Sequence, residues 1–97
     1  MARLGEKYLI RCDRSGVFYG TLVEVEGTRA RIENARKIYR WDGAACLEQL
    51  SAEGTKKPGD CKFTMTVDEI EVLDLIQLLP CTSEAIQSIE AVLEWKI

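Results

Sequence analysis

Residues 7–33 read KYLIRCDRSGVFYGTLVEVEGTRARIE, and this stretch decides the fold. It contains three runs of strand-forming residues, at 7–12, 17–25 and 28–33. Turn-forming sequences that end in Gly16 and Gly27 separate the runs. Gly20 interrupts the second run, where glycine indicates a bulge or a close approach of a neighbouring backbone. The pattern predicts an antiparallel meander of three strands.

The chain beyond the meander continues extended and then turns into a helix. Asn34 marks a predicted kink, after which 36–41 stays extended. Asp42 is placed to cap a helix over 43–52, and Gly54 would end it. A loop over 55–60 follows. Alternation then resumes in a predicted strand whose apolar face carries Cys61, Phe63, Met65 and Val67.

Residues 68–79 fit either two strands broken near Asp74 or one helix. Strands are favoured, because Pro80 ends the run and β-branched residues cluster at its start. A short helix is predicted from Ser83 to about Val92, and 94–97 would add a closing edge strand. Together these elements predict an α+β fold: a small, strongly bent antiparallel sheet, of the SH3-like or Sm-like partial-barrel type, with one inserted helix and one short C-terminal helix.

Length and composition describe one ordinary globular domain over residues 1–97, with room for one modest core. No apolar run approaches the roughly 20 residues that span a bilayer, and the first six residues lack the apolar run of a secretory signal, so we expect a cytoplasmic protein. The four cysteines include no C-x-x-C pair and the chain has no histidine, so we expect no zinc site. They are interpreted as reduced, mostly buried thiols.

The charge distribution and the absence of histidine argue against several classes of function. Residues 1–66 carry 12 Lys/Arg against 9 Asp/Glu, whereas 67–97 carry one lysine against 7 acids. This acidic half argues against a coat on long nucleic acid, which requires a broad basic surface. Without histidine, a Ser-His or Cys-His hydrolase is excluded. The acids Asp68, Glu69 and Glu71 put only two carboxylates on one strand face, which favours an acidic edge over a metal site. We therefore expect no catalytic residue, metal or cofactor.

The segment 35–44 is the richest in candidate binding residues. In an extended chain Lys37, Tyr39 and Trp41 share one face, while Arg36 and Arg40 lie on the other with Ile38. Aromatic planes can stack on a base and guanidinium groups can hold phosphates. Asp42 lies where the predicted helix presents free N–H groups. The alternative is that both rings pack in the core or in a subunit interface and the cations face solvent.

A second candidate is the turn with Arg14, Ser15 and Gly16, because a glycine turn lets backbone N–H groups approach a ligand. A plain hairpin turn is the alternative. Lys56 and Lys57 could close over a polyanion, but a solvated loop is the favoured interpretation.

Four segments of the chain form a shared pattern: Ser15-Gly16-Val17, Gly20-Thr21-Leu22, Ala35-Arg36-Lys37-Ile38-Tyr39-Arg40-Trp41-Asp42-Gly43-Ala44 and Gln77-Leu78-Leu79-Pro80-Cys81-Thr82. In these segments the chain resembles a family of short, uncharacterised proteins of tailed phages and prophages. The central piece follows the pattern Ala-Arg-Arg-x-Trp/Tyr-x-Trp-x-Gly-Ala, with Lys37 where arginine is usual; in the last piece Gln77 stands where glutamate is usual. The resemblance covers about 7–85 and implies a phage accessory protein, without assigning a catalytic residue.

By analogy of size, origin and site chemistry, we expect an anti-defence protein of the infected bacterial cytoplasm. It would sequester a nucleotide immune signal, of the cyclic ADP-ribose type or a cyclic oligonucleotide, without cleaving it. In this hypothesis Arg36 and Arg40 hold phosphates, Tyr39 or Trp41 stacks on a base, and the turn at Ser15 contributes backbone groups. A chain this short would enclose such a ligand between subunits of a homo-oligomer. The alternative is a module that binds a host enzyme or a phage component.

Overall fold

Strand β3 organises the sheet, because it pairs along both of its edges. The computed structural model describes residues 2–97. Its strands are β1 (Lys7–Cys12), β2 (Val17–Glu26), β3 (Arg29–Arg40), β4 (Lys62–Thr64), β5 (Val67–Val72), β6 (Leu75–Pro80) and β7 (Glu94–Trp95). The helices are α1 (Leu47–Glu53) and α2 (Ser83–Ala91), with a single 3₁₀ turn, η1 (Pro58–Asp60), before β4.

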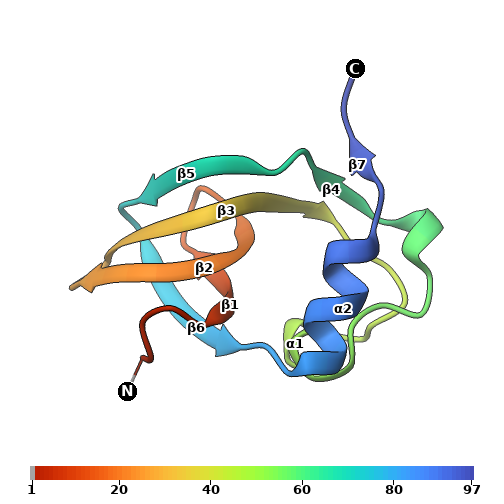
Figure 1. The fold of residues 1–97 in the computed structure, drawn as a ribbon, viewed down its shortest axis with the longest axis horizontal. Helices are drawn as coiled ribbons and strands as arrows, with labels where there is room; N and C mark the ends of the chain where they lie inside the picture. Colours follow the sequence, from red (N-terminus) through yellow and green to blue (C-terminus); the bar gives the residue numbers. More distant parts are fainter. Residues whose placement is uncertain (1) are drawn as a thin grey trace.

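The strands form one bent sheet in the order β6-β1-β2-β3-β4-β7, with β5 paired to β3 beside β4. The first half of β3 pairs with β5, and its end pairs with β4 (Figure 1). Strands β5 and β6 lie at opposite edges of the sheet, yet only Leu73 and Asp74 connect them. The sheet must therefore curl on itself. The predicted antiparallel meander and bent sheet are confirmed, but the sheet is mixed, because β7 runs parallel to β4.

Each face of the sheet has its own apolar core, as strand alternation requires. Helices α1 and α2 cover one face, where Leu9 and Phe63 pack against Ile89 (Figure 1). Inside the curl lies the second core, which includes Ile10 and Ile32. We call these the helix side and the inner side of the sheet.

Two backbone irregularities in the meander set which side chains reach which core. Gly20 lies at a register shift between β2 and β3, and a Cβ there would lie 2.9 Å from the backbone carbonyl oxygen of Glu33. Both roles predicted for Gly20 are confirmed. Asn34 takes a φ of 49°, which bulges β3. Before it Ile32 faces the inner side, and after it Ala35 does, so the alternation shifts by one residue and Arg36 turns toward the helices.

The inserted helix begins later than its sequence predicts. It starts at Leu47 instead of residue 43, because Gly43 takes a φ of +80° and Asp42 accepts a hydrogen bond from Gly43 N–H instead of capping a helix. Its predicted end at Gly54 is confirmed. The apolar face over 61–67 is also wrong in part: Phe63 is buried, but β4 ends at Thr64 and leaves Met65 exposed.

The C-terminal predictions hold. Residues 68–79 form strands β5 and β6, with the break at Leu73-Asp74. Helix α2 begins after Thr82, whose side chain accepts a hydrogen bond from Ala85 N–H. No helix within residues 2–97 is long and apolar enough to cross a membrane.

The cysteines are less buried than predicted. All four are free thiols, but only Cys12 is buried, and Cys46 is exposed. Burial raises the pKa of Cys81 to about 11, which keeps that thiol protonated at neutral pH.

Candidate functional site

Arg36, the first of the predicted phosphate ligands, is buried and bound to the protein's own backbone. Its side chain is on the helix side, and the residue is only 4% exposed. Nε donates to the carbonyl of Thr64 at 3.0 Å and Nη2 to that of Phe63 at 3.2 Å. Nη1 donates to the carbonyls of Ile89 at 3.1 Å and Val92 at 3.0 Å. We call these five residues the Arg36 hub.

The hub corrects the role predicted for Arg36. Four carbonyls already occupy its guanidinium, so the group does not face a ligand. Two of them belong to the end of α2, whose last turn has no basic residue of its own, so Arg36 supplies the positive charge that favours a helix C-terminus. Burial lowers the pKa of Arg36, although not enough for an arginine to lose its proton at neutral pH.

The other predicted residues of the segment 35–44 separate. Trp41 is half-buried and packs against the helix-side core. The side chain of Asp42 accepts a hydrogen bond from Gly43 N–H, and its backbone carbonyl accepts one from the Thr55 hydroxyl. Both contacts stabilise a turn of the chain. Arg40 is exposed, and no ion pair with it is found within residues 2–97. Of the two predicted guanidinium groups, Arg40 alone faces solvent.

The turn at 14–16 does bind an anion through backbone N–H groups, but the anion is Asp74. Oδ2 of Asp74 accepts the N–H groups of Arg14 at 2.7 Å and Ser15 at 2.8 Å. The Ser15 hydroxyl donates to Oδ1 at 2.7 Å. These hydrogen bonds, led by that of Ser15, lower the pKa of Asp74 to about 2. The turn therefore has the backbone donors predicted for it, and their hydrogen bonds to Asp74 connect the turn to the β5–β6 connection.

Lys37 is the contact between the two candidate segments predicted from the sequence, 35–44 and the turn at 14–16. A Cβ on Gly16 would lie 2.9 Å from Lys37 Cε, so the turn rests against this side chain. Lys37 Nζ lies 5.8 Å from the centroid of the Phe18 ring. Its backbone N–H donates to the Thr64 hydroxyl, which links β3 to the end of β4.

An exposed aromatic pair lies two residues beyond Lys37, where the end of β3 meets β4 and β7. The rings of Tyr39 and Trp95 stack with centroids 4.9 Å apart and planes inclined by 25°. Tyr39 is 58% exposed and Trp95 is 45% exposed. Lys62 Nζ lies 5.1 Å from the centroid of the Trp95 ring. We call Lys37, Tyr39, Lys62 and Trp95 the aromatic surface.

Sequence reasoning found Tyr39 but missed Trp95 and Lys62. Strand β7 lies beside β4, which lies beside the end of β3, so three segments far apart in sequence meet there (Figure 1). The only local signal was an aromatic residue in a predicted edge strand.

Shallow hollows flank the aromatic surface. One, of about 410 Å³, lies against Trp95 and is lined by Pro58, Cys61 and Leu93 among others. Another, of about 240 Å³, lies beyond Lys37 and is lined by Phe18, Met65 and Ile70 among others. No group of three or more His, Cys, Asp or Glu side chains within residues 2–97 could hold a metal ion.

A separate polar cluster joins the sheet to α2. Glu90 Oε2 accepts a hydrogen bond from the Tyr19 hydroxyl at 2.6 Å. The same oxygen forms an ion pair with Lys7 Nζ at 2.7 Å. The Lys7 hydrogen bond lowers the pKa of Glu90, and burial raises that of Tyr19. Because the three groups satisfy one another, we assign the cluster a structural role.

Comparison with known sequences now places the chain. A family described as Domain of unknown function (DUF6948) matches residues 5–89. The chain belongs to this family. The matched region contains the Arg36 residue, the turn at Ser15 and Tyr39, and it ends before Trp95. No curated protein and no solved structure matches the chain.

We predict that replacing Arg36 with methionine destabilises the fold by at least about 3 kcal/mol, because it removes four charge-assisted hydrogen bonds and leaves buried carbonyls unpaired. Urea denaturation measures the change. The control is Arg40→Met, which removes an exposed guanidinium from the same strand and should change the free energy of unfolding by less than about 0.5 kcal/mol. Equal effects of the two substitutions would contradict the hub.

We predict a pH-dependent effect of Asp74→Asn. Because its pKa is lowered to about 2 in the folded protein, ionised Asp74 stabilises the fold above about pH 4, and this contribution is lost as the pH falls toward 2. The variant should therefore unfold at lower urea than the wild type at neutral pH, and the difference should shrink in acid. Asp13→Asn, in the same turn, is the control and should show no such convergence. A difference that stays constant with pH would rule out this role of Asp74.

Proposed function

We propose that this protein binds a phosphate-containing nucleotide through the aromatic surface and does not cleave it. The observation that carries the proposal is the stacked, half-exposed pair of Tyr39 and Trp95 with the amino group of Lys62 over the Trp95 ring. In keeping with the resemblance to phage proteins, the proposed ligand is a nucleotide signal of the bacterial host, cyclic ADP-ribose-like or a cyclic oligonucleotide.

The chemistry of the surface suits a base next to a phosphate. Each stacked base gains about 1–3 kcal/mol on an exposed aromatic ring, and every base offers a flat face for this contact. Lys62 Nζ lies close enough to the Trp95 ring to pair with a phosphate oxygen of the same ligand. Lys37 is two residues from Tyr39 on β3, and its Nζ lies by the Phe18 ring, where it would meet a more distant phosphate of that ligand. Arg40 is exposed on the strand that carries Tyr39, and it lies opposite Lys62 in the register of β3 and β4. These cations replace Arg36 in the phosphate role.

Sequestration needs only binding, and nothing in residues 2–97 points to catalysis. The hollows beside Trp95 and Lys37 are open to solvent, so one subunit offers a platform instead of an enclosed pocket. We propose that a second copy covers the ligand, since tight capture requires most of its surface to be buried.

The second candidate function is a protein-interaction module. It is favoured by exposed apolar residues: Leu93 is 88% exposed and lines the hollow beside Trp95, and Met65, the residue after β4, is also exposed. Exposed apolar residues that cluster around aromatic ones are typical of protein interfaces.

The test is calorimetric titration with cyclic ADP-ribose and with cyclic dinucleotides and trinucleotides. We predict that Tyr39→Ala and Trp95→Ala each weaken binding by about 1–3 kcal/mol, the value of one stacked base. Ile76→Ala removes an exposed apolar residue from β6, at the other edge of the sheet, and is the matched control that should bind as the wild type does. Bound ligand released by heating should be chemically intact.

Two outcomes would overturn the proposal. If no nucleotide binds, or if both aromatic variants bind as tightly as the wild type, the aromatic surface is not a nucleotide site. If the released ligand is altered, the protein is an enzyme.

A further inference from the structure

Strand β5 has an open edge. It pairs with β3 along one side, and within residues 2–97 no strand pairs with its other side. Six residues long and largely exposed, it lies along the top of the sheet in Figure 1. An open edge presents unpaired N–H and C=O groups at the spacing that another extended chain requires.

A hollow lies along the same strand. It has a volume of about 420 Å³ and lies between the last half of β5 and the turn that follows β1, with Ser15, Phe18 and Leu73 in its lining. Phe18 and Ile70 also line the neighbouring hollow of about 240 Å³, so the depression continues along β5 toward Met65. Because Asp74 fastens the turn, one wall of the hollow is fixed before any partner binds.

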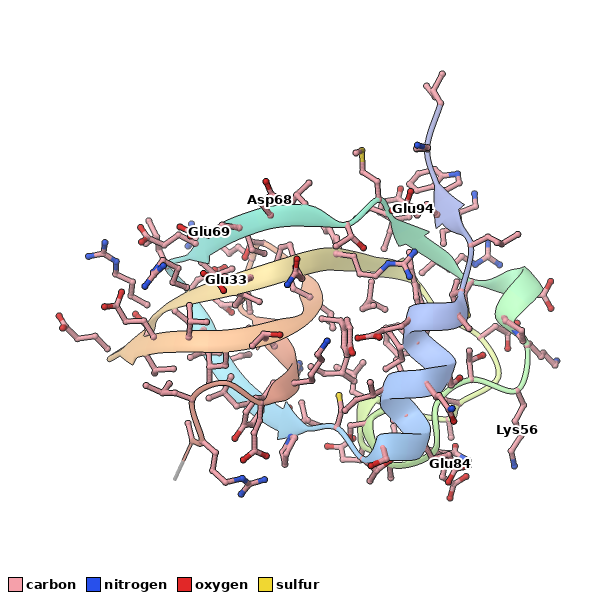
Figure 2. The ribbon with its side chains drawn as sticks, in the orientation of Figure 1. Glu33, Lys56, Asp68, Glu69, Glu84 and Glu94 are labelled. Carbon is pink, nitrogen blue, oxygen red and sulfur yellow. The ribbon has the colours of Figure 1, made fainter. Side chains whose placement is uncertain are left out.

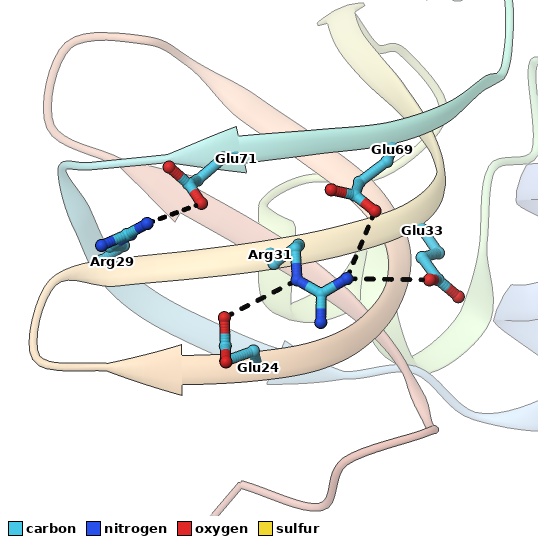
Figure 3. Close-up of polar contacts among 6 residues, drawn as sticks. All are labelled: Glu24, Arg29, Arg31, Glu33, Glu69 and Glu71. Carbon is cyan, nitrogen blue, oxygen red and sulfur yellow. Dashed lines mark hydrogen bonds and ion pairs between the residues drawn. The ribbon is translucent and has the colours of Figure 1, made fainter.

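The two faces of β5 differ in chemistry. Ile70 and Val72 belong to the inner-side core, whereas Glu69 and Glu71 lie on the opposite face next to Arg31 and Arg29 (Figure 3). In a strand paired with β5, alternate side chains would point to opposite faces of the sheet. One set would lie next to Ile70 and Val72, and the other set next to Glu69 and Glu71.

Carboxylates are in excess along this edge. Residues 67–74 contain four acids and no lysine or arginine. Arg31 is shared among Glu24 at 3.6 Å, Glu33 at 4.0 Å and Glu69 at 3.3 Å, so its charge is divided among three carboxylates (Figure 3). Asp68, exposed on the same strand, adds a further carboxylate (Figure 2). The edge therefore attracts cations.

We infer that the open edge of β5 binds an extended segment of a partner protein in which apolar residues alternate with lysine or arginine. The backbone of the segment would pair with β5. Its apolar side chains would enter the hollow by Phe18 and Ile70, and its basic side chains would meet Glu69 and Glu71. The partner is not a second copy of this chain, since two β5 strands paired edge to edge would bring their carboxylates together. Lys37 lines the smaller hollow and also belongs to the aromatic surface, but Tyr39, Lys62 and Trp95 line neither hollow beside β5. Variants of Tyr39 and of Glu69 and Glu71 therefore test the two proposals separately.

The probe is a capped peptide of about seven residues in which lysine alternates with valine, matching the length of β5. It is titrated into the wild-type protein and followed by amide NMR signals and hydrogen exchange. We expect shifts in β5 and at Phe18, with slower exchange of β5 amides. Two control peptides isolate the causes: glutamate in place of lysine removes the charge match, and N-methylation of alternate residues removes the backbone donors. Neither should bind.

Variants of the protein locate the site. The double change Glu69→Gln with Glu71→Gln should weaken binding of the lysine–valine peptide about fivefold, because it removes two cross-strand charge pairs. Glu84→Gln, an exposed carboxylate at the start of α2, is the matched control and should bind normally (Figure 2). Tyr39→Ala should also bind this peptide normally, which separates the site from the nucleotide proposal.

Three results would overturn the inference. The first is absence of binding by the lysine–valine peptide. The second is equal binding of the N-methylated peptide, which would show simple charge attraction without strand pairing. The third is a concentration-dependent dimer of the protein alone whose NMR changes map to β5, which would assign the edge to a second copy.

Discussion

The buried guanidinium of Arg36 is the contact on which the arrangement of this protein depends. It binds four backbone carbonyls, two from β4 and two from the end of α2, and so joins three segments that share no local sequence. A buried cation with no ion-pair partner within residues 2–97 costs desolvation energy, which the four hydrogen bonds and the Phe63 ring 5.4 Å away offset. The contact fixes the position of β4 against β3. Because β7 pairs with β4, it also places Trp95 next to Tyr39.

The sequence predicts well those parts of the fold that local patterns control. The meander, the role of Gly20 and helix α2 follow from alternation, turn residues and capping residues within short windows. The strands over 68–79 are less well determined, because the pattern also fits a helix and only Pro80 and the β-branched residues favour strands. The position of Arg36 does not, because its face depends on the bulge at Asn34, and a strand without the bulge would point the neighbouring side chains the other way. The late start of α1 has a similar origin, since Gly43 adopts a turn that contacts the distant 55–57 segment.

In the candidate site, the sequence indicates what each group can bind, but it does not indicate which group of the protein occupies it. The turn at Ser15 was correctly interpreted as an anion-binding arrangement of backbone donors, yet Asp74, sixty positions along the chain, provides the anion. Tyr39 is exposed, as a binding residue must be, but its stacking partner Trp95 comes from β7. Residue types indicate what a group can bind; the fold decides whether a ligand or the protein itself occupies it. Two surfaces remain open by this criterion, the aromatic surface and the edge of β5.

The most direct test of this account is the NMR spectrum of the Arg36 guanidinium, assigned by comparison with a conservative Arg36→Lys variant. The account predicts separate, slowly exchanging Nη protons, because hydrogen bonds to four carbonyls stop rotation and exclude water, and it predicts that these signals do not move when nucleotide is added. A single averaged, rapidly exchanging signal, as for an arginine in solvent, or a shift caused by nucleotide, would contradict it.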